Sequence, residues 1–324
     1  MSKILICGLN WLGDGIMSMP AVRAYKQLNP DASITMLVKK SMSELWGMCE
    51  AVDEIMVLDP GLAGLLRAAE HIAGKGYDEA YIFPNSWRSG LSPMLAGIPI
   101  RKGAGGNGRN WMLSDIVKDS SDGQHQSSEY FKILGFDVSP FDMPLLTFDG
   151  ADDIRKKFIT SGKPVVAIMP GAAFGKAKMW PKEHFIGVAK KLINDKSCYI
   201  AVMGVASEKD LCKGIADELK EDAVCLAGKT SLMQSSAILA GCSAVVCNDS
   251  GGMHLAAAAG ARVVAVYGIT DPEKTGPMGS GHKLIMAEGV ERARDLERDS
   301  SEAIKAMESI KPDVVYDAVV EVLG

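Results

Sequence analysis

The 324-residue sequence has no apolar run long enough to cross a bilayer and no excess of positive charge. A membrane-spanning helix needs about 18 or more apolar residues in a row. The first residues, MSKILICGLN, are typical of a β-strand rather than of a signal peptide. The formal net charge of −5 excludes a protein that coats nucleic acid, because such a protein needs a broad basic surface. We therefore expect a cytoplasmic protein without a nucleic-acid partner.

The sequence also lacks paired cysteines. Its seven cysteines are odd in number, scattered, and never arranged as C-x-x-C. A disulfide framework or a structural zinc site would need paired or closely spaced thiols. No carboxylate cluster for a metal ion is obvious either. We expect the thiols to be small buried groups at strand and helix positions, and we expect no metal or other cofactor to be required.

Short apolar runs alternate with amphipathic segments of helix length along the whole chain. The first half has KILICG, SITMLVK, EIMVLD and EAYIFP, with helices expected at 16–28, 41–49 and 62–74. From about residue 150 the pattern starts again with VVAIMPG, CYIAVMG, AVCLAG, SAVVCND and RVVAVYG, and helices near 183–193, 207–219, 231–240 and 251–259. Strands covered on both faces read as continuous apolar runs. The pattern predicts an α/β protein with two Rossmann-like doubly wound domains facing a central cleft, and ligands beyond the carboxyl ends of the strands.

The domain boundaries follow from the polar segment 148–163, which we interpret as a linker with a lead-in helix. We predict a first domain over residues 1–155 and a second over 156–311. Residues 312–324, PDVVYDAVVEVLG, have apolar residues at helical spacing with a proline in the first turn. This closing helix could cross back to the first domain. The charged stretch 288–311 is also expected to be helical.

The first loop of interest is GLNWLGDGIMSMPA, from Gly8 to Ala21. Its glycines resemble a phosphate loop, but Asp14 stands where that loop needs its lysine, and G-x-G-x-x-G is absent as well. Neither a nucleoside triphosphate nor NAD is expected here. Asp14 has two interpretations that the spacing alone leaves open, a helix N-cap and a general base at the end of the first strand.

The second loop is PGAAFGKAKMWPKEHF, after the strand VVAIM. Small residues including Gly171 leave backbone N–H groups accessible, and Lys176 and Lys178 add positive charge, which together suit a phosphate or diphosphate. The alternative is that both lysines are solvated. Trp180 is expected to pack and hold the loop in place.

The third loop, NDSGGMHLAAAAGA, joins a strand to a helix of small residues. A helix N-terminus opened by Gly251 and Gly252 is a ready anion site, because its first N–H groups are unpaired. Asp249 is either an N-cap or a partner for a hydroxyl, ribose or N–H group. His254 is either a ligand or a satisfied helix residue.

A fourth stretch, residues 80–114, contains no acidic residue. It reads as a Gly-rich loop, and its cations could clamp the carboxylates or phosphates of a second substrate. The alternative is a solvated loop. The predicted acceptor-binding residues are Asn85, Arg88, Arg101, Lys102 and Arg109.

Taken together, these four motifs resemble the ADP-heptose:lipopolysaccharide heptosyltransferases of glycosyltransferase family 9, most closely the heptosyltransferase II branch. The resemblance covers residues 3 to 280, with the motifs in the family's order. It implies a GT-B fold, with the acceptor in the first domain and the nucleotide-sugar in the second. Asp14 matches the family's proposed catalytic base and Lys178 its diphosphate lysine. The donor-binding motif matches Asp249, Ser250, Gly251 and His254.

The resemblance implies an inverting, ADP-heptose-dependent glycosyltransferase of lipopolysaccharide biosynthesis. Its acceptor would be an inner-core glycolipid that carries Kdo carboxylates and lipid A phosphates. We expect a monomer, peripheral at the inner face of the inner membrane. Family members often have a cysteine-containing segment where this chain has the charged residues 288–311, so another nucleotide-sugar or acceptor is the first alternative. A UDP-sugar transferase or epimerase and a non-catalytic nucleotide-sugar-binding protein also remain open.

Overall fold

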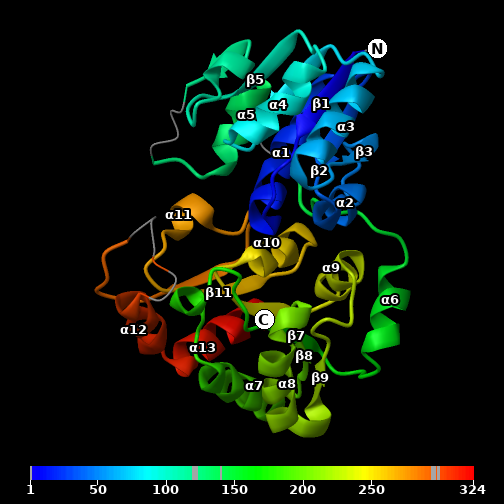
Figure 1. Cartoon of the computed structure of the whole chain (residues 1–324). Coiled ribbons are helices and arrows are strands. Elements are labelled where there is room, and N and C mark those ends of the chain that lie inside the picture. The colour runs from blue at the N-terminus through cyan, green and yellow to red at the C-terminus, as the bar shows by residue number, and fades with distance from the viewer. Residues whose placement is uncertain (1, 119–122, 139–140, 293–296, 298–299) are drawn as a thin grey trace. The chain divides into compact units, whose positions relative to one another are not determined.

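A computed structural model describes residues 2–118, 123–138, 141–292, 297 and 300–324 (Figure 1). The chain divides into two compact units, Met1–Thr147 and Phe148–Gly324. We predicted that the first domain ends at residue 155, whereas the first unit ends at Thr147. The difference arises because helix α6 (Ala151–Phe158) packs against α9 (Leu232–Ala240) of the second unit. The predicted linker with its lead-in helix therefore belongs to the second unit.

The first unit contains one six-stranded parallel sheet, in the order β3-β2-β1-β4-β5-β6. Its strands are β1 (Lys3–Cys7), β2 (Ser33–Val38), β3 (Glu54–Val57), β4 (Glu79–Ile82), β5 (Ile100–Ala104) and β6 (Asp115–Val117). Its helices are α1 (Leu12–Leu28), α2 (Lys40–Gly47), α3 (Gly61–Ala73), α4 (Trp87–Leu95) and α5 (Ser127–Leu134), with a 3₁₀ turn η1 at Asn110–Met112. Helix α1 packs against α5, and α3 packs against α4.

The second unit repeats this topology, with the strand order β12-β11-β10-β7-β8-β9. The strands are β7 (Val165–Met169), β8 (Tyr199–Val202), β9 (Ala223–Cys225), β10 (Ala244–Asn248), β11 (Val263–Tyr267) and β12 (Lys283–Met286). In each sheet the strand order reverses between the first and fourth strands, β1 and β4 or β7 and β10. Doubly wound sheets bind ligands beyond the carboxyl ends of the strands at such a reversal, so these two edges are where functional residues are expected.

The helices of the second unit include α7 (Lys182–Lys196), α8 (Lys209–Leu219), α10 (Gly251–Ala258), α11 (Pro272–Thr275), α12 (Ser301–Ser309) and α13 (Pro312–Leu323), with 3₁₀ turns η2 (Lys176–Lys178), η3 (Ala206–Glu208) and η4 (Lys220–Asp222). Helix α13 packs on α7 and on strands β10 to β12. Its Val315 and Val319 are fully buried in the core of this unit. The apolar stripe of residues 312–324 is therefore buried within the second unit, and a crossing of these residues to the first domain stays a prediction.

The core explains why the apolar runs form strands. Every residue of β10 and β11 is buried, since helices cover both faces of a doubly wound sheet. Six of the seven cysteines are buried as predicted, and Cys225 is half-buried. Burial raises the pKa of the Cys7, Cys212 and Cys242 thiols to about 12, which keeps them protonated at neutral pH.

Residues 80–114 differ most from the prediction. They form α4, β5 and η1 rather than one long loop. Gly90 and Pro93 lie inside α4 and lower its intrinsic helix propensity, so the sequence hides the helix. Adjacent charges, Arg101 and Lys102, interrupt the apolar run and obscure β5 in the same way, although this strand is paired on both sides, with β4 and β6. Among the described helices, none is long and apolar enough to cross a membrane.

Candidate functional site

Two residues of the second unit meet where its strand order reverses. Lys178 ends η2 in the loop after β7, and Asp249 directly follows β10. The Lys178 ammonium donates to Asp249 Oδ2 at 2.5 Å. Asp249 is only 6% exposed, and the Lys178 side chain is 21% exposed. The structure therefore joins two of the predicted donor-binding residues into one ion pair at the expected edge.

A third neighbouring loop completes this network. Thr270 follows β11, and its hydroxyl donates to the same Asp249 Oδ2 at 2.8 Å. Thr270 is itself buried, at 7% exposure. A carboxylate oxygen that receives both an ammonium and a hydroxyl proton holds the lysine in one orientation. Sequence reasoning missed Thr270, although its place just after an apolar strand next to β10 was a usable signal.

Asn248 fixes the loop that carries Lys178. Its side-chain oxygen accepts from the Trp180 backbone N–H at 3.0 Å, and its amide donates to the Pro170 carbonyl at 2.7 Å. Trp180 is 2% exposed, and its indole N–H donates to the Ile310 carbonyl at 3.0 Å. The predicted packing role of Trp180 is confirmed, and both ends of the loop from 170 to 180 are held by one buried amide.

Helix α10 begins next to Asp249. Its N-cap is Ser250, whose side chain makes no capping hydrogen bond, so the N-cap interpretation of Asp249 is wrong. Gly251 and Gly252 form the first turn, and residues 253–258 are buried, including His254 at 4% exposure. A β-carbon at Gly252 would lie 2.5 Å from the Met169 methyl group. The small residues thus let α10 lie against the sheet. The N–H groups of its first turn follow Asp249 closely in the chain, and Asp249 binds Lys178.

Gly171 and Lys176 have different places in the same loop. A β-carbon at Gly171 would lie 1.9 Å from a carboxylate oxygen of Glu208, so a larger residue here would have to displace the end of the Glu208 side chain. Glu208 follows β8, is half-buried and accepts from the Val205 N–H at 3.0 Å. The sequence did not reveal it, because it stands among other exposed charges. Lys176 is exposed and makes no ion pair within the described residues.

Asp14 of the first unit lies in the first turn of α1. The N-cap is Trp11, so the N-cap interpretation of Asp14 is also wrong. Gln126, which precedes α5, donates to Asp14 Oδ1 at 3.2 Å and to the Tyr130 hydroxyl at 3.1 Å. Burial, reinforced by the Asp14 charge, raises the pKa of Tyr130. The Gln126 amide therefore positions the half-buried Asp14 carboxylate. Nothing in the sequence pointed to Gln126 as a site residue.

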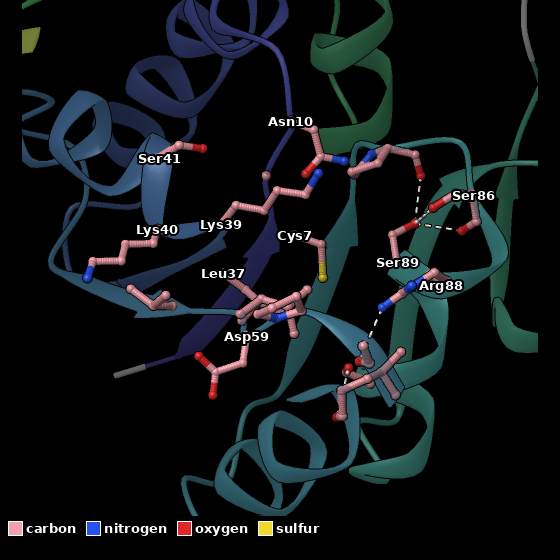
Figure 2. A pocket seen from close by; sticks show the side chains of 18 residues that line it. Cys7, Asn10, Leu37, Lys39, Lys40, Ser41, Asp59, Ser86, Arg88 and Ser89 are labelled. Atoms are coloured by element: carbon pink, nitrogen blue, oxygen red, sulfur yellow. Dashed lines mark hydrogen bonds between the residues drawn. The ribbon is translucent and has the colours of Figure 1, made fainter. Parts of the chain in front are cut away.

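A pocket of about 600 Å³ opens at the carboxyl end of the first sheet (Figure 2). Lys39 reaches across it toward Asn10, Arg88 enters from the α4 side, and Lys40 points away from its centre (Figure 2). The Arg88 guanidinium donates to the Gly61 carbonyl at 3.2 Å. The lining residues are Cys7, Gly8, Asn10, Leu37, Lys39, Lys40, Ser41, Val57, Leu58, Asp59, Pro60, Gly61, Leu65, Pro84, Ser86, Arg88, Ser89 and Ser92.

The charge of this pocket is positive. Its one acid, Asp59, is paired with Arg67 at 3.0 Å. Within the described part of the chain, no acid forms an ion pair with Lys39, Lys40 or Arg88. Cations without an acidic partner in a concave site attract anions. Sequence reasoning missed both lysines, although two cations directly after an apolar strand were visible.

The other predicted acceptor residues serve the fold. Arg109 is fully buried, and its guanidinium donates to the carbonyls of Ala104 and Pro84. Arg101 donates to the Met112 carbonyl at 2.6 Å. Main-chain carbonyls already take N–H groups of these two arginines and tie the segment after β5 to the sheet. Their contact with an acceptor stays a prediction.

Lys102 and Asn85 do not line the pocket either. The Lys102 ammonium lies 3.9 Å from Glu79 and 5.7 Å from the centre of the Tyr81 ring. Asn85 is exposed, and its carbonyl accepts from the Asn107 amide at 2.8 Å. Of the five predicted acceptor residues, Arg88 alone is among the residues that line the described pocket. Among the described residues there is also no group of three or more His, Cys, Asp or Glu side chains that could hold a metal ion.

Comparisons with known proteins identify the family of this chain. Residues 65–305 match the model of glycosyltransferase family 9 (heptosyltransferase). The chain belongs to glycosyltransferase family 9. It is 32% identical over 305 residues to lipopolysaccharide heptosyltransferase 2 of Escherichia coli K12, covering 87% of each chain. It is 31% identical over 306 residues to lipooligosaccharide heptosyltransferase 2 of Haemophilus influenzae, covering 87% of this chain and 88% of that protein.

A solved structure supports the same assignment for this family 9 member. The structure of E. coli ADP-heptose lps heptosyltransferase II matches with a TM-score of 0.86 and 28% identity, covering 99% of this chain and 98% of that one. The predicted α/β GT-B fold and the glycosyltransferase class are therefore confirmed. In this chain the two domains of the GT-B fold have the strand orders β3-β2-β1-β4-β5-β6 and β12-β11-β10-β7-β8-β9.

Proposed function

We propose that this family 9 glycosyltransferase transfers a heptose from ADP-heptose to the inner core of lipopolysaccharide, with inversion at the anomeric carbon. The observation that carries the proposal is the network of Lys178, Asp249 and Thr270 beside the N-terminus of α10. An ammonium and open helix N–H groups at a strand-order reversal suit a diphosphate. The relatives described above are named for heptosyl transfer, which supplies the sugar.

The donor is held by the second unit in this proposal. An ammonium has three N–H donors, and Asp249 uses one of those of Lys178. The remaining donors are available for the β-phosphate, while Asp249 and Thr270 keep the side chain in place. The N–H groups at Gly251 and Gly252 take a second phosphate oxygen. As the bond between the sugar and ADP breaks, negative charge grows on the β-phosphate, and preorganised donors of this kind each contribute a few kcal/mol.

Asp14 acts on the acceptor. Its carboxylate takes the proton from an acceptor hydroxyl, and that oxygen attacks the anomeric carbon while ADP leaves from the opposite face. Gln126 holds the carboxylate through Oδ1. Proton transfer by a positioned side chain contributes roughly 10²–10⁴-fold to a rate. No metal is needed in this scheme, because Lys178 and the helix N–H groups meet the leaving-group charge.

The acceptor is an anionic core glycolipid whose charged sugars enter the pocket lined by Lys39 and Arg88. The enzyme works in the cytoplasm as a monomer, peripheral at the inner face of the inner membrane. This placement follows from the acceptor, whose lipid part stays in the bilayer while its sugars reach the pocket.

Asp14→Ala provides the direct test. We expect transfer from ADP-heptose to a truncated core acceptor to be abolished, while ADP affinity by calorimetry stays within twofold of the wild-type value. UDP-heptose and UDP-glucose serve as competing donors. Preference for a UDP-sugar would replace the donor in the proposal, and an equal loss of transfer and ADP affinity in the variant would contradict the role of Asp14. Tight ADP-heptose binding without turnover by the wild type would favour the non-catalytic alternative.

A further inference from the structure

The outer face of two neighbouring helices in the first unit carries large apolar side chains. Leu62 and Leu66 of α3 are 62% and 51% exposed, and Trp87 and Leu95 of α4 are each 49% exposed. The two leucines of α3 are four residues apart and therefore share one side of their helix. Trp87 and Leu95 are eight residues apart, about two turns, and share a side of α4 in the same way.

Contacts between the two helices hold them side by side. Helix α3 packs against α4. The Arg88 guanidinium donates to the Gly61 carbonyl, and the Ser92 hydroxyl donates to the Leu65 carbonyl at 3.3 Å. Leu62 and Trp87 are the chain neighbours of Gly61 and Arg88, so the first of these bonds joins the two N-terminal ends. We call Leu62, Leu66, Trp87 and Leu95 the α3–α4 patch.

The two helices that carry the patch also line the basic pocket. Gly61 and Leu65 of α3 and Arg88 and Ser92 of α4 line that pocket, and Figure 2 labels Arg88 among them. The patch and part of the pocket lining thus belong to the same two helices. The pocket also contains Lys39 and Arg88, which form no ion pair with an acid among the described residues. Tryptophan and leucine next to lysine and arginine form the pattern of a protein surface that lies in a membrane interface.

We propose that the α3–α4 patch docks on an anionic lipid bilayer, with its apolar side chains at the boundary between headgroups and acyl chains. Lys39 and Arg88 then face anionic headgroups, which attract nearby cations. The use of this docking rests on the proposed function. Docking would bring the pocket to the depth at which the sugars of a membrane-embedded acceptor leave the bilayer. The docking itself requires neither donor nor acceptor.

Charge argues against a second copy of the chain as the occupant of the patch. A two-fold interface places the same surface of both subunits face to face. Two copies joined through this patch would bring Lys39 and Arg88 of one toward the same cations of the other, and like charges brought together oppose association. A bilayer with anionic headgroups supplies the opposite charge instead.

Vesicle flotation with the full chain tests the docking. Wild type should float with vesicles of phosphatidylglycerol and phosphatidylethanolamine, bind phosphatidylcholine vesicles less, and lose binding as salt is raised. The double variant L66Q/L95Q should bind the anionic vesicles at least about tenfold more weakly, because two half-exposed leucines lose their apolar contact with lipid. The matched control is V205Q/V314Q, which changes two apolar residues of the second unit that are at least as exposed (61% and 52%) and should bind like wild type.

Two activity measurements separate this proposal from the proposed function. L66Q/L95Q should transfer to a delipidated, water-soluble acceptor at the wild-type rate but more slowly to acceptor in vesicles. Wild type that does not bind anionic vesicles would overturn the docking and leave transfer to the soluble acceptor untouched. Wild type that binds vesicles but transfers nothing from ADP-heptose would overturn the function and leave the docking intact. A dimer by light scattering that L66Q/L95Q converts to monomer would overturn the docking in favour of a second copy.

Discussion

Replacement of Lys178 by methionine separates a structural ion pair from a ligand-binding lysine. The ammonium donates to Asp249 Oδ2 at 2.5 Å, and Asp249 is 6% exposed. Removing one partner of a buried pair costs roughly 3–5 kcal/mol. Because Lys178 is one-fifth exposed and Thr270 still donates to Asp249, we expect about half of that, about 2 kcal/mol. The Tm should fall by about 4–8 °C, given the usual shift of about 2–4 °C per kcal/mol for domains of this size.

The same substitution should weaken ADP binding about 10- to 100-fold, the value of one charge-assisted hydrogen bond. Calorimetric titration with ADP and a thermal melt measure the two effects on one sample. In the double variant K178M/D249N no charge is left unpaired, so part of the Tm should return, while ADP affinity should stay low. The control K156M removes one exposed lysine of α6 and should change neither quantity.

Two results would refute this reasoning. If folded K178M binds ADP within twofold of wild type, Lys178 is only a structural partner of Asp249. If K178M/D249N regains both the Tm and the ADP affinity, the loss in the single variant came from the unpaired carboxylate rather than from the missing ammonium.

Three further predictions concern the metal, a glycine and the thiols. Transfer should be unchanged after EDTA treatment and dialysis, and a loss that Mg²⁺ restores would disprove the metal-free scheme. Gly171→Ala should lower the Tm, because its β-carbon would lie 1.9 Å from the Glu208 carboxylate and displace it from the Val205 N–H; an unchanged melt would show that this side chain moves aside without cost. Burial raises the pKa of Cys7, Cys212 and Cys242 to about 12. The folded chain therefore keeps thiol protons that the unfolded chain loses above about pH 9, so the unfolding free energy should fall as pH rises from about 9 to 12, and a thiol reagent at pH 8 should label these residues only after unfolding.

The sequence was sufficient for the fold because a parallel sheet covered on both faces imposes a pattern that can be read locally. Continuous apolar runs such as VVAIM and RVVAVYG became β7 and β11, and the small residues after Gly252 became the close-packed α10. It was not sufficient for α4, where Gly90 and Pro93 lower the intrinsic preference and packing against α3 supplies the stability.

For the candidate site, the sequence determined which loops follow which strands, and so it located Lys178, Asp249 and Asp14 at the carboxyl edges of the two sheets. Only the tertiary structure decided what each side chain does there. Thr270 reaches Asp249 from the loop after β11, and Gln126 reaches Asp14 from the turn before α5, more than a hundred residues away in the chain. Main-chain carbonyls take the N–H groups of Arg109, although its charge suggested a ligand. The physical reason is that a loop's place in a doubly wound sheet follows from the order of local elements, whereas a hydrogen bond depends on which distant groups the packed sheet brings within about 3 Å.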